Sequence, residues 1–588
     1  MAQKIVNPTI ISAAEAIAAR PSHSDWPFFI FDADAALERA RHLTAACKEY
    51  FPDAVIAVSV KSCSLGIFLR LIAEEGLSAE VCSADEFKLA LKAGFTGDRI
   101  ILDGPYKNAE DLSLALNNGA LVHIDSAHEL NEIIRLTSGY NQKFSVGVRL
   151  SHLYSGTQRS RFGVTAEEFR DEIIPLLTSC PNISLRGFHL HTGSNLENPS
   201  KVTDSLRDWL PFLVKNMPDG GHLDMGSGFP ADSFSPDTAI PTMGPAVFFR
   251  DIYSVLSEYD PALTQKWKLI FEPGRTLSED HGYAIGKTVS VKNRYDSEVI
   301  QTNLGINWIP SVHNWHHSLL PLGNDEHTPD DTAQILAGFN CFENDCLFPK
   351  GPLHLKKNQL FIIRGCGAYD LQTANEWTRT RPPVYALLNQ EIITARLPSP
   401  ALPAAMLDLM HAEKSLCVDE NIQLAPASSR FAAELFSVVD RNREEFSQYM
   451  AWPRFVKTAD DESGFLDACL LAHQKNEGKT YVILFNDAAV GLLSFNSIDS
   501  ANKTAYIGYW LDMKVQGQGV ITRALNALVK DYSERKLINR FVIKCSVSNL
   551  KSNEVARRCG FVLEGKMRKA ELLNGVFHDQ NVYSYIAP

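Results

Sequence analysis

The sequence predicts an α/β protein built from more than one domain, and three observations support this fold class. The chain has 588 residues, more than one hydrophobic core covers, so two to four domains are expected. From residue 51 to residue 275, short apolar runs alternate with segments of helical periodicity. After a region of strand-like patterns, the last part of the chain again combines strands with an amphipathic helix.

Eight apolar runs in the first half of the chain predict a barrel. They are separated by helical segments such as "ADEFKLALKAGF" and "SAHELNEIIRL". Eight strand–helix units in roughly 250 residues are typical of a (β/α)8 barrel, which we place at about residues 35–280. The expected strands are "AVIAVSV", "LSAEV", "RIILDG", "LVHID", "FSVGVRL", "SLRGFHL", "GHLDMG" and "KLIFEPG".

Polar residues and glycines follow these runs at their C-terminal ends. Active sites of (β/α)8 barrels lie at that face, so we expect these residues to share one site. They are Lys61, Glu80, His191, Ser194, Gly226 to Gly228 and Glu272 to Arg275.

Three further segments complete the expected organisation. Residues 281–397 have strand-like patterns, and with an N-terminal strand they predict a β domain that completes the first domain, residues 1–400. Residues 401–421 lose periodicity and predict a linker with a short helix. Residues 422–588 predict a second α/β domain, with a hairpin around Asn486 and Asp487 and a helix in "ITRALNALVKDYSERK".

Composition favours an enzyme that acts on small molecules. Hydrophobic residues make up 45% of the chain and charged residues 21%, as in ordinary soluble proteins. A net charge of −12 argues against a nucleic-acid polymer as partner, because phosphates demand a basic surface. The start of the chain lacks a signal-peptide pattern and no apolar run is long enough to span a membrane, so we expect a cytoplasmic protein. Eleven cysteines without CxxC pairs indicate reduced thiols.

The stretch "GFHLHTGSN" places His189 and His191 on one face of an expected strand. Such a pair can bind a metal, but no pattern nearby supplies a third ligand, so we expect no metal. Glycines near Ser194, in "MGSGF" and in "EPGR" instead follow three neighbouring strands, where backbone N–H groups converge on a phosphate. Arg275 would add a bidentate clamp. Lys61 closes an apolar run, where an unused amine is costly.

Together these motifs resemble the fold-type III pyridoxal-phosphate-dependent decarboxylases, the family of ornithine, diaminopimelate and arginine decarboxylases. The resemblance covers about residues 25–395 and implies an alanine-racemase-like fold, a pyridoxal 5′-phosphate cofactor and a homodimer. It implies that Lys61 forms the Schiff base and that His191 stacks on the pyridine ring, which leaves His189 structural. Glu272 would lie opposite the ring nitrogen. The resemblance places the phosphate near Ser194, Gly226, Ser227, Gly228, Gly274, Arg275 and Tyr369, with Ser227 where the family usually has glycine.

A glutamate at position 272 favours decarboxylation over racemisation, since both reactions occur on this fold. A carboxylate keeps the ring nitrogen protonated, so that the cofactor is a full electron sink for the carbanion left when CO₂ departs. Alanine racemases instead place an arginine at this position.

The resemblance also implies a catalytic cysteine that reaches in from the partner subunit. It corresponds to Cys341 in "AGFNCFENDCLF", with the matching Asp345 four residues on. Relatives that act on diamino acids carry Asp or Glu directly after this cysteine, whereas this chain has Phe342, which cannot pair an ammonium. We infer a larger substrate that carries an amino-carboxy group and binds near Phe342 and Asp345. Glu343 is the alternative partner for a distal amine.

In the last domain a strand, a glycine loop and a helix follow one another in "YWLDMKVQGQGVITRAL". Exposed amides at such a helix start bind a pyrophosphate. With "NLKSNEVARRCGFVLEG" further on, the loop resembles the GNAT acetyltransferases, specifically the branch acting on ribosomal-protein N-termini, over about residues 422–588. The resemblance implies acetyl-CoA as cosubstrate, with Asn549 near its thioester. The loop would be formed by Val515, Gln516, Gly517, Gln518, Gly519, Val520, Ile521 and Thr522, with Ile521 where the family usually has Gly or Ala.

The same resemblance implies roles in acetyl transfer. Ser552 would protonate the leaving thiolate, and Glu571 would be the base for the amine, directly or through water. Read alone, Glu571 is equally well an exposed strand carboxylate. Trp452 and Phe465 lie in the expected acceptor region. If both face a cleft, two rings can sandwich a nucleobase of the substrate; otherwise they are core residues.

The order of the two domains resembles the bifunctional biosynthesis and self-immunity enzymes of peptide-nucleotide antibiotics of the microcin C type. It implies decarboxylation of a 3-amino-3-carboxypropyl group on the antibiotic and N-acetylation of processed aminoacyl nucleotides, which confers antibiotic resistance on the producer. Two alternatives stay open, a siderophore-pathway enzyme acting on a citryl-amino acid or diamine, and a decarboxylase-like binding protein. The second is disfavoured because Lys61, Glu272 and Cys341 are all present.

Overall fold

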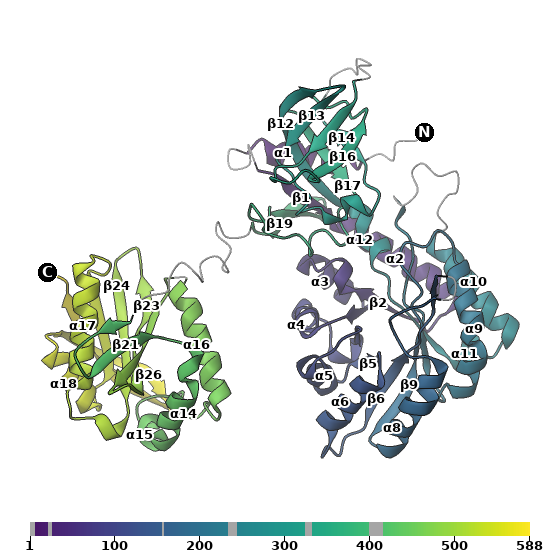
Figure 1. Ribbon diagram of the computed structural model, residues 1–588. Coiled ribbons are helices and arrows are strands. Elements are labelled where there is room, and N and C mark those ends of the chain that lie inside the picture. Colours follow the sequence, from purple (N-terminus) through teal and green to yellow (C-terminus); the bar gives the residue numbers. More distant parts are fainter. Residues whose placement is uncertain are drawn as a thin grey trace. The chain divides into compact units, whose positions relative to one another are not determined.

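The computed structural model describes residues 6–20, 26–155, 158–232, 244–323, 332–398, 415–474 and 476–588 (Figure 1). The chain forms two compact units, Met1–Pro400 and Ala401–Pro588, and each has a hydrophobic core of its own. Of the expected linker, residues 401–414 lie outside the described residues, and the rest contains the short strand β20 (Leu416–Cys417). Within the described ranges, no helix has the length and apolar character needed to cross a bilayer.

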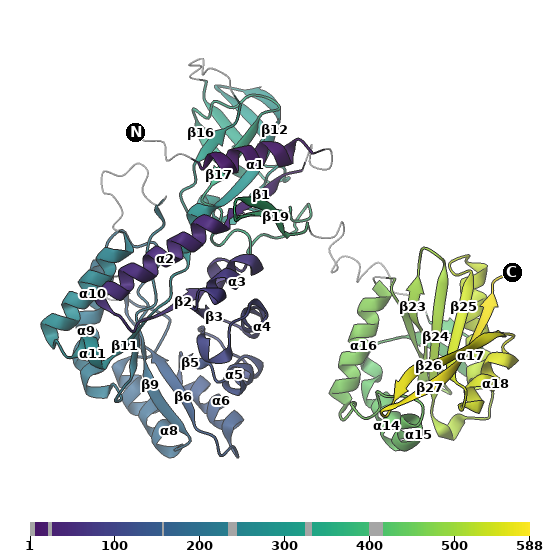
Figure 2. The same cartoon turned by 180° about the vertical axis from the view of Figure 1, so that it is seen from behind.

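Eight parallel strands of the first unit close into a barrel, which confirms the eight apolar runs (Figure 2). They follow one another in chain order, and the barrel closes where β11 pairs with β2. The strands are β2 (Val55–Ser59), β3 (Ser78–Val81), β4 (Ile100–Asp103), β5 (Leu121–Ile124), β6 (Phe144–Arg149), β9 (Ile183–His189), β10 (His222–Asp224) and β11 (Lys268–Phe271). The helices around them include α2 (Ala33–Tyr50), α3 (Gly66–Glu74), α4 (Ala84–Ala93), α5 (Ala109–Asn117), α6 (Ala127–Thr137), α9 (Ser200–Asn216) and α10 (Pro245–Tyr259).

The helices that follow the barrel strands begin and end at residues suited to those positions. The Ser83 side chain accepts from the Glu86 N–H at the start of α4, which ends at Gly94 with a φ of 109°. A reciprocal capping box between Asn108 and Asp111 begins α5. Such caps satisfy N–H groups that the first turn leaves without partners, and glycine adopts the left-handed end at no steric cost. The caps therefore fix the loops at the C-terminal face of the barrel.

A second sheet of nine strands completes the first unit. Its central strand β1 (Phe28–Asp32) comes from the N-terminal part of the chain and pairs antiparallel with β12 and parallel with β18. Helix α1 (Pro8–Ala18) packs on β1 in a small separate core. The other strands are β12 (Gly282–Arg294), β13 (Ser297–Thr302), β14 (Leu319–Pro321), β15 (Gln334–Ala337), β16 (Cys346–Gly351), β17 (Leu360–Arg364), β18 (Val384–Leu388) and β19 (Glu391–Arg396).

The second unit is an open eight-stranded sheet with helices on both faces (Figure 1). One core lies under α17 (Val520–Glu534) and the other under α14 (Ala432–Arg441) and α16 (Ala459–Gln474). The expected hairpin joins β22 to β23 through Asn486 and Asp487, whose φ values of 51° and 63° suit a tight turn. The strand order is β20, β21 (Ile422–Pro426), β22 (Lys479–Phe485), β23 (Ala488–Asp499), β24 (Thr504–Leu511), β25 (Arg540–Ser546), β27 (Val576–Ile586) and β26 (Val562–Leu573).

Strands β24 and β25 diverge at one end of this sheet. Their parallel pairing runs from Thr504 to Ile507 of β24, while β23 pairs with β24 as far as Leu511. On the side of β25, the last residues of β24 therefore border an opening, while on the other side they remain paired with β23. Helices α17 and α18 (Leu550–Arg558) start beside that opening, since they follow β24 and β25 in the chain.

Because the two units have separate cores, we expect a cavity in one core to destabilise that unit alone. Leu528 of α17 and Leu206 of α9 are both fully buried. Replacing either with alanine should lower the free energy of unfolding of its own unit by about 2–5 kcal/mol. Calorimetry of the full chain should show one transition lowered by Leu528→Ala and the other by Leu206→Ala. A shift of both transitions by either substitution would contradict independent cores.

Candidate active sites

Lys61 lies at the C-terminal face of the barrel, in the single helical turn Val60–Ser62 after β2. Its Nζ donates a short hydrogen bond to Glu80, a fully buried carboxylate of β3 that also accepts from the Ser59 hydroxyl. Burial opposes a charge on Lys61, but the carboxylates of Glu80 and Glu272 outweigh it and raise the pKa of Lys61 well above its usual value. The sequence placed Glu80 at this face without a role, and the structure makes it the counter-ion of the lysine.

Glu272 follows β11 directly and is 5% exposed. Burial and the nearby carboxylates of Asp224, Glu80 and Asp103 raise the pKa of Glu272 well above its usual value. Among the described residues, Oε1 of Glu272 has no hydrogen-bond partner. Buried acceptors in folded proteins almost always have a donor, so this oxygen fits the ring N–H of a bound pyridoxal phosphate.

His191 is held against the glycine loop that follows β10. Gly226 has a φ of 58°, and a Cβ there would lie 2.5 Å from Nδ1 of His191, so this approach requires glycine. The same Nδ1 accepts a hydrogen bond from the Ser227 N–H at 3.3 Å. Burial, with the charge of Arg149, lowers the pKa of His191 well below its usual value. The imidazole is therefore neutral and can stack on an aromatic ring.

Backbone hydrogen bonds join the turn that carries Ser194 to this glycine loop. The Leu196 N–H donates to the Gly228 carbonyl at 2.9 Å, and the Asn195 side chain accepts from the Ala231 N–H at 3.2 Å. Gly228 has a φ of 105°, which favours glycine. The structure thus brings the exposed Ser194 next to residues 226–228, where consecutive N–H groups can cradle a phosphate.

The side chain of Arg275 is buried among other side chains of the site. Its guanidinium forms an ion pair with Glu279 through Nη1 and lies over the rings of Trp315 and Tyr369, 3.9 and 4.7 Å from their centroids. Nε of Arg275 has no hydrogen-bond partner among the described residues, so the bidentate phosphate clamp stays a prediction.

The turn that carries Lys61 is held from two sides. A Cβ at Gly274 would lie 2.8 Å from the Ser62 hydroxyl, so glycine allows the end of β11 to approach this turn. The Tyr369 N–H donates to the Ser62 carbonyl at 2.9 Å, and the Gln372 side chain donates to the Lys61 carbonyl at 2.8 Å. The sequence gave no signal for Gln372, because its partner lies more than 300 positions away.

Cys341 and Phe342 lie exposed in the loop between β15 and β16. Asp345, by contrast, is 3% exposed, and its carboxylate accepts from the backbone N–H groups of Ile306 and Asn340 at 2.8 and 2.7 Å. A carboxylate used in this way cannot bind a substrate as the sequence suggested. Its role is to fix the loop that presents Cys341.

In the second unit, the glycine loop lies between β24 and α17. Gly517 and Gly519 have φ values of 79° and 74°, and no side chain caps the start of α17. The N–H groups of this first turn are therefore open to a pyrophosphate. Val520 and Ile521 are buried in the core, so they support the helix and only their backbone faces the loop.

Ser552 lies on α18 beside the opening between β24 and β25. Its hydroxyl is 2.9 Å from the hydroxyl of Tyr509 on β24, and burial raises the pKa of that tyrosine. Asn549, expected near the thioester, accepts from the Ser552 N–H at 3.1 Å and so caps α18. Tyr509 was missed in the sequence, although it lies shortly before the glycine loop.

Glu571 is half-buried on β26, and Gln580 of β27 donates to its Oε2 at 3.0 Å. The predicted aromatic pair is not in ring contact in this structure. The ring of Trp452 contacts Trp510 of β24 at 5.8 Å between centroids, while Phe465 is 46% exposed on α16. Trp510 thus joins the candidate acceptor site. It directly follows Tyr509 on β24, so the two side chains lie on opposite faces of the sheet, Tyr509 against the core under α17 and Trp510 against the core under α14 and α16.

Comparison with known proteins gives two family matches. Residues 37–279 match the pyridoxal-binding domain of the pyridoxal-dependent decarboxylases, and residues 421–562 match the GNAT acetyltransferase domain. The ribosomal-protein-serine acetyltransferase of Escherichia coli is 39% identical over 173 residues, 29% of this chain and 97% of that protein. The diaminopimelate decarboxylase of Bacillus methanolicus is 27% identical over 390 residues, 62% of this chain and 88% of that protein.

Two solved structures complete the comparison. Diaminopimelate decarboxylase from M. jannaschii covers 66% of this chain and 92% of its own, with a TM-score of 0.59 at 19% identity, which shows the fold. The microcin C7 self-immunity acetyltransferase in complex with acetyl-CoA and AMP is 44% identical and covers 29% of this chain and 94% of its own. Its TM-score of 0.29 is too low for an argument from its structure. The second unit belongs to the GNAT acetyltransferases and the first is a pyridoxal-phosphate-dependent decarboxylase, so the chain is a bifunctional enzyme of these two families.

Proposed function

We propose that the first unit decarboxylates the 3-amino-3-carboxypropyl group of a peptide-nucleotide antibiotic of the microcin C type. The second unit acetylates the α-amine of processed aminoacyl nucleotides and so protects the producing cell. The observation that carries this proposal is the aromatic contact of Trp452 with Trp510, on the strand that also carries Tyr509. Two half-buried aromatic rings suit an acceptor with a flat base.

The surroundings of Cys341 support a substrate larger than a free diamino acid. Both relatives of the first unit named above are diaminopimelate decarboxylases, and the distal end of diaminopimelate carries an ammonium and a carboxylate. In this chain the residue after Cys341 is Phe342, 45% exposed. A phenyl ring cannot balance an ammonium, but it can pack on the apolar or aromatic part of a larger molecule.

In the decarboxylation, pyridoxal phosphate supplies the electron sink that accepts the bonding pair when CO₂ leaves. Lys61, whose amine is paired with Glu80, would hold the cofactor. Glu272 would accept its ring N–H, and backbone N–H groups of the glycine loop and the Ser194 turn would hold its phosphate. Cys341, from the partner subunit of a homodimer, returns a proton to the carbon that lost CO₂.

In the acetyl transfer, the acceptor amine attacks the thioester carbon of acetyl-CoA. Glu571, oriented by Gln580, takes the proton from the amine, directly or through water. The N–H groups around Gly517 and Gly519 hold the pyrophosphate of coenzyme A. Ser552 donates a proton to the departing thiolate, and Tyr509 orients the serine hydroxyl. An acetylated amine is neutral and no longer makes charge-assisted bonds in a pocket built for an ammonium.

Substituting Lys61 tests the assignment of the first site. Lys61→Ala should abolish the visible absorbance of the bound cofactor and the release of CO₂, because no other amine takes its place. Absorbance spectra and a CO₂ assay on the full chain measure both, and acetyl transfer should be unchanged. Lys92→Ala, at an exposed position of α4, is the matched control and should leave both activities intact. A Lys61→Ala protein that keeps the absorbance would refute the assignment.

Substituting Ser552 and Tyr509 tests the general acid proposed for acetyl transfer. Loss of a general acid lowers the rate by about 10²–10⁴-fold. Ser552→Ala should therefore lower kcat for acetyl transfer by at least about 10²-fold, with little change in KM. Tyr509→Phe keeps the ring and removes the hydroxyl, and should lower kcat by a smaller factor. The control Ser533→Ala changes a serine that bonds only within α17. An unchanged kcat in Ser552→Ala would mean that another group protonates the leaving thiolate.

Substituting Trp452 tests the nucleotide acceptor. Stacking on a base contributes about 1–3 kcal/mol, so Trp452→Ala should raise KM for an aminoacyl sulfamoyl adenosine by about 5- to 150-fold. The KM for an acceptor with the same aminoacyl group but without adenine should stay the same. Steady-state kinetics with both acceptors provides the comparison. If the enzyme accepts both equally well before mutation, the second unit does not recognise a base.

A further inference from the structure

The interior of the barrel, directly below the cofactor site, is polar. Barrels of this kind usually fill this space with branched apolar side chains. Two glycines make room for imidazoles here, since a Cβ at Gly147 would lie 2.2 Å from Cδ2 of His123, and one at Gly187 would lie 2.7 Å from Cγ of His222. The ionisable side chains in this interior are each at most 5% exposed; they are Asp103, His123, His189, His222, Asp224 and Glu272.

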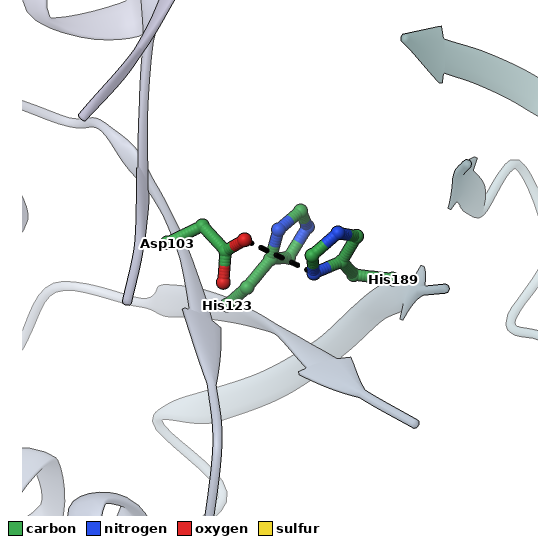
Figure 3. Close-up of side chains that lie close together, drawn as sticks. All are labelled: Asp103, His123 and His189. Atoms are coloured by element: carbon green, nitrogen blue, oxygen red, sulfur yellow. Dashed lines mark ion pairs between the residues drawn. The ribbon is translucent and has the colours of Figure 1, made fainter. Parts of the chain in front are cut away.

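His189 lies between two of the carboxylates. Its Nδ1 is 3.2 Å from Oδ2 of Asp103, and its Nε2 is 3.7 Å from Oε2 of Glu272. Figure 3 shows the carboxylate of Asp103 facing the imidazole of His189, with His123 close by. The rings of His123 and His189 are stacked, with 5.1 Å between centroids. Neither nitrogen of His189 makes a hydrogen bond of good geometry, although the whole side chain is buried. The contacts of His189 are therefore those of a charge placed between two carboxylates.

Carboxylates outnumber permanent cations around this point. A buried carboxylate needs a proton or a nearby cation, since an unpaired charge in a dry interior is costly. Although burial opposes its ionisation, His189 and Arg149 hold the pKa of Asp103 well below its usual value, so Asp103 carries a charge. Burial raises the pKa of Asp224 to about 6. The carboxylates are Glu80, Asp103, Asp224 and Glu272, and the permanent cations are Lys61 and Arg149.

We propose that His189 is a positioning residue of the decarboxylase, which as an imidazolium joins the charged Asp103 to Glu272 and keeps Glu272 ionised opposite the cofactor's ring nitrogen. The sequence assigned His189 a structural role only. This inference rests on the proposed role of Glu272. It adds a partner behind Glu272. In the same way, a buried carboxylate behind a catalytic histidine fixes the orientation of the ring and raises its basicity.

Ionisable groups on five strands or strand ends interact with His189. Asp103 is the nearer of the two carboxylates that flank it, with 3.2 Å between its Oδ2 and Nδ1 of His189. The two neighbouring imidazoles add no charge, since burial lowers the pKa of His123 well below its usual value and lowers the pKa of His222 to about 3. The groups that interact with His189 are Asp103, His123, His191, His222, Asp224 and Glu272.

The test uses pyridoxal phosphate labelled with ¹⁵N in its ring and bound to the full chain. The ring-nitrogen chemical shift reports directly whether that nitrogen is protonated. In the unaltered protein we expect a protonated ring. His189→Gln removes the cation between the carboxylates, so the proton should move from the ring to Glu272 and the shift should become that of an unprotonated ring. Affinity of the cofactor-free chain for pyridoxal phosphate should fall at least tenfold, about the factor of one pKa unit.

Two further variants make the result specific. Asp103→Asn keeps the shape of the side chain and removes its charge, so the ring shift should move in the same direction by a smaller amount. It also decides the question if His189→Gln does not fold. His222→Gln is the matched control, because His222 is as deeply buried but pairs with His123 at 2.9 Å instead of with Asp103 or Glu272. In this control the ring should stay protonated.

The outcomes separate this inference from the proposed function. If the unaltered chain binds the cofactor with an unprotonated ring, the role of Glu272 itself fails. If its ring is protonated and remains so in both His189→Gln and Asp103→Asn, only the role of His189 fails. An equimolar transition metal in the purified protein, lost in His189→Gln, would also overturn the inference, because the imidazole would then be a metal ligand.

Discussion

In the proposed mechanism, the first unit must keep the carboxylate of Glu272 charged in the buried interior of the barrel. Glu272 lies at the end of a strand in a closed barrel, and burial together with three other carboxylates works against its ionisation. Basic side chains lie beside these carboxylates. Lys61 faces Glu80, Arg149 lies near Asp103, and His189 lies between Asp103 and Glu272. The strands of the barrel fix each of these groups, so the chemistry of the site depends on the register of the whole barrel.

In the second unit, backbone N–H groups are the main candidates for binding a phosphate. The divergence of β24 and β25 opens the sheet, and the glycine loop after β24 leaves the first N–H groups of α17 without caps. These N–H groups can bind a phosphate, and the cationic side chains of Lys551 and Arg523 contact the same loop at Gln516 and Gln518. Ser552 and Tyr509, the residues proposed for acetyl transfer, come from the two elements that border the opening.

Local patterns carried most of what the sequence predicted. The eight barrel strands, the hairpin at Asn486 and the helix after the glycine loop all have signals within a few neighbouring residues. The partners of individual side chains had no such signal. Arg275 was expected on a phosphate and pairs with Glu279, Asp345 was expected on a substrate and holds a loop, and the position of His189 between carboxylates depends on three strands. The type of a residue indicates which chemistry its side chain can perform, but the fold determines which partner that side chain contacts.

The two sheets also differ in how they end. The barrel of the first unit closes on itself and leaves no strand unpaired, whereas the sheet of the second unit ends at β26, a twelve-residue strand that is exposed along almost its whole length. An open edge of this length can template pairing with another chain and lead to aggregation. Lys566, Arg568 and Lys569 lie on this edge and are exposed. Their positive charges disfavour pairing of this edge with a copy of the same strand.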